Sequence, residues 1–258
     1  MGGLDGTHVL ITGGGSGLGA AMARALAERG AAVSLAGRRR DALTAIAASL
    51  PRAAVCPADI TREDDCARMV AEARAAFGPI DIVIGNAGAA ASAPFAKTTL
   101  AQFQAALDVN LTGAFLTVQA ALADLLRPQV VGGGPRRIVL VASTAGLKGY
   151  AYVAPYVAAK HGVVGLARAL AAEYARTPLT ANAVCPGYVD TPLFEETIGT
   201  IVAKTGRSTA EARAALVASN PQGRLVTPEE VAATVAWLCS DAAGSITGQA
   251  IAVAGGEI

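Results

Sequence analysis

Tyr156 and Lys160 are residues whose types and spacing could move a proton. Pro155 predicts that a helix begins here, with Tyr156 in its first turn. A spacing of four residues places the phenol and the ammonium on one helix face. Both the ammonium and the positive end of the helix favour a phenolate, so we expect the pKa of Tyr156 to fall from about 10 toward neutrality. Such a phenol could act as general acid and base, although a Tyr and a Lys at this spacing alone more often mark an ordinary helix face.

Ser143 precedes Tyr156 by 13 positions and follows an apolar run that predicts a strand. Ligands of open α/β sheets bind at the carboxyl ends of strands, so this hydroxyl could hydrogen-bond a substrate oxygen. The alternative is that Ser143 only caps the turn that follows it. A Ser and a Tyr donor together could stabilise an oxyanion without a metal ion.

A glycine-rich turn, TGGGSGLG at positions 12–19, stands between a predicted strand and a predicted helix. Residues without Cβ allow a close approach to a pyrophosphate, which the helix start would face. This context favours dinucleotide binding over a plain tight turn. Ala20 stands where a phosphate-binding P-loop needs Lys, and Leu18 stands where a hydrolase nucleophile elbow needs Gly.

Arginines occupy the end of the second predicted strand, where many dinucleotide sites carry a carboxylate for the ribose diol. Arg38 and Arg39 could grip a 2′-phosphate that an Asp would repel. We therefore expect NADP(H), with NAD(H) as the alternative cofactor, and rank Arg38 above Arg39 because it lies nearer the strand. The competing interpretation is a solvated helix start, although cations there oppose the helix dipole.

Short apolar runs alternate with longer helical patterns along the whole chain, which predicts a parallel sheet wrapped by helices. The strands are expected at 8–12, 32–36, 53–56, 81–84, 137–142, 181–185 and 250–253. Right-handed crossovers then favour a doubly wound, seven-stranded α/β fold in a single domain, 1–258. The stretch 187–221 is too long for an ordinary α/β loop and is expected to be a substrate lid. A Gly/Pro-rich stretch at 130–136 is expected to be a surface loop.

The composition excludes several classes of function. The chain has 258 residues, 53% hydrophobic, and 21 Lys and Arg against 20 Asp and Glu, so no basic surface for nucleic acid or an anionic membrane is expected. There is no uninterrupted apolar run of about 18 residues and no leader pattern, so we expect no membrane span and a cytoplasmic location. The four cysteines and two histidines lack metal-ligand spacing, so reduced thiols and no metal site are expected.

Further motifs occur in a fixed order along the chain. They are Thr12 to Gly19, Asp59-Ile60, Asn86-Ala87-Gly88, Asn110, Ser143, Tyr156 with Lys160, Pro186-Gly187, Thr191-Pro192, Thr247-Gly248-Gln249 and Gly255-Gly256. With these motifs the sequence resembles the short-chain dehydrogenase/reductase family over nearly its whole length. The resemblance implies a Rossmann fold and a homo-oligomer, usually a tetramer, with contact faces on the helices at 98–126 and 155–174.

The resemblance also implies a role for each matching residue. Tyr156 would be the general acid and base, Ser143 would orient the substrate oxygen, Lys160 would hold the nicotinamide ribose, and Asn110 would anchor a proton-relaying water. The implied cofactor contacts are Gly13, Gly15, Ser16, Gly17, Leu18, Gly19, Arg38, Arg39, Asp59, Ile60, Asn86, Ala87, Gly88, Tyr156, Lys160, Pro186, Gly187, Val189 and Thr191. Several of these have plainer interpretations: Asp59 as a turn former, Asn86 as a strand-end cap, Asn110 as a helix kink and Thr191 as a residue before proline.

The expected function is NADP(H)-dependent interconversion of a ketone and a secondary alcohol. The segment from Ser143 to His161 is similar to polyketide ketoreductases and 3-hydroxyacyl-thioester dehydrogenases, which suggests a β-ketoacyl thioester or a bulky cyclic ketone. Two alternatives stay open: an NAD-dependent alcohol or hydroxyacyl-CoA dehydrogenase, and a protein that senses dinucleotide without turnover. The candidate pocket walls are Leu147, Tyr150, Tyr152, Tyr188, Leu193, Phe194, Ile198 and Ile201, unless these side chains belong to the core or to subunit contacts. Lys204, Arg207 and Arg213 could meet phosphates of a carrier, or simply form a solvated helix face.

Overall fold

The sheet of the computed structural model, which describes residues 3–128 and 134–258, has seven parallel strands. They are β1 (His8–Thr12), β2 (Ala32–Gly37), β3 (Ala53–Pro57), β4 (Ile82–Gly85), β5 (Arg136–Val141), β6 (Leu179–Pro186) and β7 (Ala250–Val253). Their order is β3-β2-β1-β4-β5-β6-β7, so the doubly wound fold is confirmed, and each predicted strand end lies within two residues of its observed position. Of the segments discussed above, residues 1–2 and 130–133 lie outside the described part of the chain.

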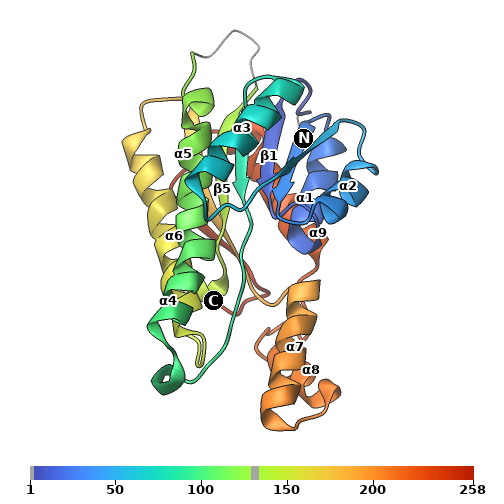
Figure 1. The fold of residues 1–258 in the computed structure, drawn as a ribbon, viewed down its shortest axis with the longest axis vertical. Coiled ribbons are helices and arrows are strands. Elements are labelled where there is room, and N and C mark those ends of the chain that lie inside the picture. The colour runs from blue at the N-terminus through green and yellow to red at the C-terminus, as the bar shows by residue number, and fades with distance from the viewer. Residues whose placement is uncertain (1–2, 129–133) are drawn as a thin grey trace.

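Helices cover both faces of this sheet (Figure 1). One face carries α1 (Gly17–Ala27), α2 (Arg40–Ala47) and α9 (Pro228–Leu238), and the other carries α3 (Glu63–Phe77), α5 (Gly113–Leu125) and α6 (Ala154–Glu173). Successive strand residues point to opposite faces, so Val9 and Ile11 join the first core cluster and Leu10 joins the second. This double burial explains why the strands read as continuous apolar runs.

A long helical stretch on the second face combines α4 (Leu100–Leu107), a π-helical turn at Asp108–Thr112 and α5. The whole stretch, Leu100–Leu125, is long and apolar enough to cross a membrane, and 33% of its most apolar 18 residues are buried. A single helix of this kind is weak evidence for a membrane span, because core helices of soluble proteins can have the same length and composition.

Two further helices, α7 (Pro192–Thr205) and α8 (Thr209–Val217), follow β6 and extend away from the layered body (Figure 1). They enclose a small core of their own around Phe194, Ile198 and Ala212. Both helices fall within the long segment 187–221, so the sequence placed this departure from the α/β rhythm correctly.

A buried ionic cluster lies at the opposite, amino-terminal end of the central strands. Asp81 is 4% exposed and accepts hydrogen bonds from the His8 main-chain N–H at 2.8 Å, from the Arg127 guanidinium at 2.5 Å and from the buried Arg136. The neighbouring Asp124 accepts from the Ile80 N–H at 3.0 Å and pairs with Arg74. These contacts join β1, β4, β5 and the end of α5 at one end of the sheet.

Candidate active site

Tyr156 and Lys160 lie on one face of α6, as their spacing predicts. The helix begins at Ala154 with Pro155 in its first turn, and Lys160 Nζ lies 5.5 Å from the centroid of the Tyr156 ring. Lys160 is buried and donates a hydrogen bond to the main-chain oxygen of Val141, the last residue of β5, at 2.9 Å. The ammonium is therefore held between α6 and the carboxyl end of β5.

Ser143 lies two residues beyond β5 and begins a 3-10 turn, Thr144–Gly146. Its Oγ accepts a hydrogen bond from the Ala145 N–H at 3.1 Å, so the capping interpretation of this residue is correct. The Ser143 side chain also lies near the Tyr156 phenol, where it acts to lower the pKa of that phenol. One side chain therefore serves both as a cap and as the partner of the phenol.

The pKa of Tyr156 is shifted upward, and not toward neutrality as the sequence led us to expect. Burial raises the pKa of Tyr156 to about 12, and the nearby Ser143 side chain only partly opposes this rise. Burial also lowers the pKa of Lys160 to about 8. Desolvation disfavours the charged form of each group, and the ammonium is turned to Val141 rather than to the phenol oxygen. In this arrangement the phenol is firmly protonated at neutral pH.

Asn110 is buried in the π-helical turn between α4 and α5. Its amide nitrogen donates to the main-chain oxygens of Ala89 and Ala106 at 2.8 and 2.9 Å, and its oxygen accepts from the Ala89 N–H at 3.2 Å. A Cβ on Gly88 would lie 2.7 Å from the Asn110 oxygen and 3.5 Å from Lys160 Nζ. Asn110, Gly88 and Lys160 therefore meet at one point beside the pair, and π-turns of this kind are frequent at functional sites.

The glycine-rich turn has the form of a phosphate cradle. Gly13 has φ 68°, and a Cβ there would lie 2.8 Å from the Asn86 amide, which itself donates to the Thr12 main-chain oxygen at 2.9 Å. A Cβ on Gly19 would overlap the Gly13 oxygen. Ser16 precedes α1 without a side-chain cap on its first N–H groups. This helix start therefore fits an anionic pyrophosphate, both in space and in charge.

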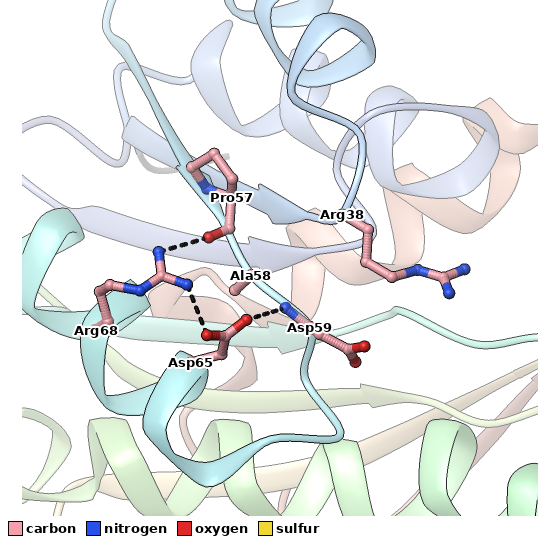
Figure 2. A pocket seen from close by; sticks show the side chains of 6 residues that line it. All are labelled: Arg38, Pro57, Ala58, Asp59, Asp65 and Arg68. Atoms are coloured by element: carbon pink, nitrogen blue, oxygen red, sulfur yellow. Dashed lines mark hydrogen bonds and ion pairs between the residues drawn. The ribbon is translucent and has the colours of Figure 1, made fainter.

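A pocket of about 330 Å³ lies between the ends of β2 and β3 (Figure 2). Its lining residues are Arg38, Pro57, Ala58, Asp59, Asp65 and Arg68. Hydrogen bonds from the Thr61 N–H and hydroxyl hold the pKa of Asp59 below its usual value, and the charge of Arg38 adds to this effect. The Arg38 side chain is exposed and points away from the Arg68–Asp65 pair (Figure 2), while Arg39 reaches Ser16 Oγ at 3.5 Å.

Sequence reasoning missed Asp65 and Arg68 in this pocket. Arg68 pairs with Asp65 at 2.7 Å and donates to the Pro57 oxygen at 3.0 Å, and Asp65 accepts from the Asp59 N–H at 2.9 Å (Figure 2). The signal that could have found them is the spacing of three residues between Asp65 and Arg68 at the start of α3, which is typical of a salt bridge on a helix. This pair forms a fixed wall opposite Arg38.

The remaining predicted contacts gather near the same edge of the sheet. Pro186 ends β6, Gly187 donates its N–H to the Val253 oxygen at 3.1 Å, and Thr191 immediately precedes α7 without a side-chain capping hydrogen bond. A Cβ on Gly17 would lie 3.5 Å from the Thr191 side chain, so the starts of α1 and α7 meet. The other predicted contacts are Gly15 and Leu18 in the turn, Ile60 and Ala87 after β3 and β4, and Val189 beside Val226.

Two candidate pocket walls belong instead to the helical pair. Phe194 and Ile198 are 3% and 2% exposed and pack between α7 and α8, so of the two interpretations left open for them the structure favours a core position. Arg213 pairs with Glu195 at 2.5 Å and with Asp190 at 3.5 Å, and Lys204 bonds the Ser92 oxygen. These two cations are thus engaged by protein groups rather than free for carrier phosphates.

The comparisons with known proteins agree with this geometry. A family model described as enoyl-(acyl carrier protein) reductase matches residues 13–257. The chain belongs to the short-chain dehydrogenase/reductase family. As a member of this family it is an oxidoreductase that acts on CH–OH groups and binds a nicotinamide dinucleotide.

Relatives within the short-chain dehydrogenase/reductase family align over nearly the whole chain. Cis-4-hydroxycyclohexanecarboxylate dehydrogenase of Sinomonas cyclohexanicum is 39% identical over 96% of this chain and 94% of its own length. A putative ketoacyl reductase of Streptomyces coelicolor is 36% identical over 98% and 97%. The solved structure of an actinorhodin polyketide ketoreductase variant with NADPH superposes with a TM-score of 0.92 at 35% identity, covering 100% of this chain and 99% of the other.

Proposed function

We propose that this oxidoreductase interconverts a ketone and a secondary alcohol with NADP(H), using Tyr156 as general acid and base. The observation that supports this most directly is the position of the Tyr156 phenol, beside Ser143 and one helical turn from the buried Lys160. The uncapped start of α1 and its glycine turn fit the pyrophosphate of the cofactor.

The residues of the chain would divide the work at the carbonyl. The bound dinucleotide would supply the hydride. Tyr156 would give its phenol proton to the carbonyl oxygen as negative charge develops there, and the Ser143 hydroxyl would stabilise the same oxygen. The raised pKa of Tyr156 keeps the phenol protonated at neutral pH, which suits the reductive direction. Arg38 would face the 2′-phosphate, Asp59 the adenine, and Lys160 the nicotinamide ribose.

We further propose a six-membered cyclic ketone as the substrate class, with α7 and α8 as the lid over it. Two similar proteins are named for a hydroxycyclohexanecarboxylate and for levodione. The test is a panel of substituted cyclohexanones and β-ketoacyl thioesters, with NADPH oxidation followed by absorbance. Turnover of the cyclic ketones supports the proposal. Turnover of the thioesters alone would show that the substrate is a β-ketoacyl thioester instead of a cyclic ketone. If the folded protein turns over neither group, the proposed function is contradicted.

Replacement of Arg38 should switch the cofactor preference. We expect Arg38→Asp to raise the KM for NADPH about 10- to 100-fold, because a charge-assisted contact to the 2′-phosphate is lost, and to lower the KM for NADH. Paired kinetics with the two cofactors measure this change. Arg40→Ala is the matched control, since Arg40 is also exposed but lies at the start of α2. A wild-type protein that already prefers NADH would contradict our assignment of Arg38.

The exposed apolar side chains of the α4–α5 stretch support association between copies of this chain. Leu100 is 81% exposed and Phe115 is 44% exposed. We expect a tetramer in sedimentation, with this stretch and α6 as contact faces. Phe115→Glu should shift the protein to smaller species, because burying an unpaired charge in an interface is costly. A wild-type protein that sediments as a stable monomer would refute this proposal.

A further inference from the structure

Four polar side chains form a connected cluster beside the candidate site: Thr144, Lys148, Tyr150 and Glu257. Tyr150 Oη lies 2.6 Å from Thr144 Oγ1 and 2.5 Å from Glu257 Oε1. A carboxylate only accepts hydrogen bonds, so the single phenol proton of Tyr150 goes to Glu257 and Thr144 donates to Tyr150. Lys148 Nζ adds an ion pair to Glu257 Oε1 at 3.1 Å and a bond to its main-chain oxygen, also at 3.1 Å.

Glu257 is the penultimate residue, yet its side chain is only 2% exposed. Its second oxygen, Oε2, is buried without a hydrogen-bond partner among the described residues. That oxygen would lie 3.1 Å from a Cβ on Gly187, so it packs directly behind the loop that follows β6. Burial of a charged carboxylate is costly, and the Lys148 and Tyr150 contacts are what offset that cost here.

The approach of Glu257 depends on a turn at Gly255 and Gly256, whose φ values are 60° and 91°. A Cβ on Gly255 would collide with the Asn220 side chain, so this turn is packed in place. Residues 255–257 are therefore held in place, and they bring Glu257 back against the segment that follows β5.

That segment carries Ser143. The Gly146 N–H donates to the Ser143 oxygen at 2.8 Å, and the Leu147 and Lys148 N–H groups donate to the Thr144 oxygen at 2.9 and 3.0 Å. The turn that orients Ser143 is thus tied, through Thr144 and Tyr150, to the Glu257 carboxylate. The same carboxylate contacts the Gly187 loop, on the other side of the site.

We propose that Glu257 is a positioning residue for the reaction: through Tyr150, Lys148 and Thr144, its carboxylate locks the 144–150 segment and so holds Ser143 in register with Tyr156. Glu257 touches neither substrate nor the reacting atoms. This inference rests on the proposed function only in its use of Ser143 and Tyr156. It predicts local loosening of the 144–150 segment whatever the substrate is.

The test compares Glu257→Ala, Glu257→Gln, Tyr150→Phe and the Tyr150→Phe/Glu257→Ala double variant with the wild type. We expect Glu257→Ala to lower kcat about 10- to 100-fold, since small misplacements of a reacting geometry have effects of this size, with KM for NADPH unchanged. Glu257→Gln should recover part of the loss, because its amide oxygen still accepts from Tyr150. The double variant should be no slower than Glu257→Ala, since both changes break one chain of contacts.

Hydrogen exchange gives a second measurement that needs no substrate. In Glu257→Ala the amides of Gly146, Leu147 and Lys148 should exchange faster, with the amides of β1 and α1 unchanged. Ile258→Ala is the matched control, because Ile258 is the adjacent residue and is 52% exposed. It should match the wild type in both kcat and exchange.

Three results would overturn the inference: a kcat of Glu257→Ala within twofold of wild type, additive losses in the double variant, or an increase in exchange spread over the whole chain. Tyr156→Phe, measured alongside, separates this inference from the proposed function. If Tyr156→Phe keeps turnover, the proposed function fails. If Tyr156→Phe is inactive while Glu257→Ala is unchanged, only the role of Glu257 fails.

Discussion

Tyr156→Phe should lower kcat by about 10²- to 10⁴-fold, the usual contribution of a general acid, while NADPH still binds with wild-type affinity. The change removes one oxygen from a ring that is already packed in the first turn of α6, so neither the fold nor the cofactor cradle around α1 is disturbed. Ser143 and Lys160 stay in place, but there is no proton to give to the substrate oxygen. NADPH oxidation with the best ketone of the panel, together with nucleotide titration by fluorescence, measures the two quantities separately.

Tyr174→Phe is the matched control, because it removes the same oxygen from the residue that directly follows the same helix. Its kcat should equal that of the wild type. A Tyr156→Phe protein that turns over within a few-fold of wild type would exclude Tyr156 as the acid. A protein that also loses NADPH binding would show that the phenol serves the cofactor site rather than the proton transfer.

Asp81→Asn should be among the most destabilising single changes in the chain, at about 3 to 5 kcal/mol, the usual effect of removing one partner from a buried ion pair. Arg136 is 3% exposed and has Asp81 as its carboxylate partner, and Arg127 shares the same oxygen. Burial already lowers the pKa of Arg136. Without the Asp81 charge, the buried Arg136 guanidinium loses its carboxylate partner at the start of β5, at the opposite end of the sheet from the candidate site.

Chemical denaturation at a fixed protein concentration measures this loss, since association would otherwise alter the apparent stability. Glu72→Gln is the control: its ion pair with Arg68 has side chains that are 48% and 41% exposed, and it should change the free energy of unfolding by less than about 1 kcal/mol. If Asp81→Asn costs no more than Glu72→Gln, the cluster at the amino-terminal end of the sheet is not a stability determinant.

The strands and main helices could be predicted from the sequence because their signals are local. A strand buried on both faces is apolar along most of its length, as Val9, Leu10 and Ile11 of β1 show, and proline at the start of a helix marks α6. The three polar residues of the candidate site could also be predicted, since strand ends and helix turns place Ser143, Tyr156 and Lys160 at one edge of the sheet. In each case the geometry is specified by residues that lie close together in the sequence.

Properties that depend on distant neighbours could not be predicted. The direction of the Tyr156 pKa shift is set by burial under segments from elsewhere in the chain, and the Lys160 ammonium turns to a carbonyl of β5. Which face of α7 is buried depends on the placement of α8, which is why the sequence left open whether Phe194 lines a pocket or a core.

The sequence by itself determined the doubly wound fold class, the positions of its strands along the chain and the residue types at the reacting edge, because side-chain periodicity and turn chemistry act over a few residues. Only the tertiary structure decided which groups lose water and which charges meet. Glu257 reaches Tyr150 across 107 positions, and no local pattern encodes that contact, since it exists only once the last strand and the C-terminal turn have packed.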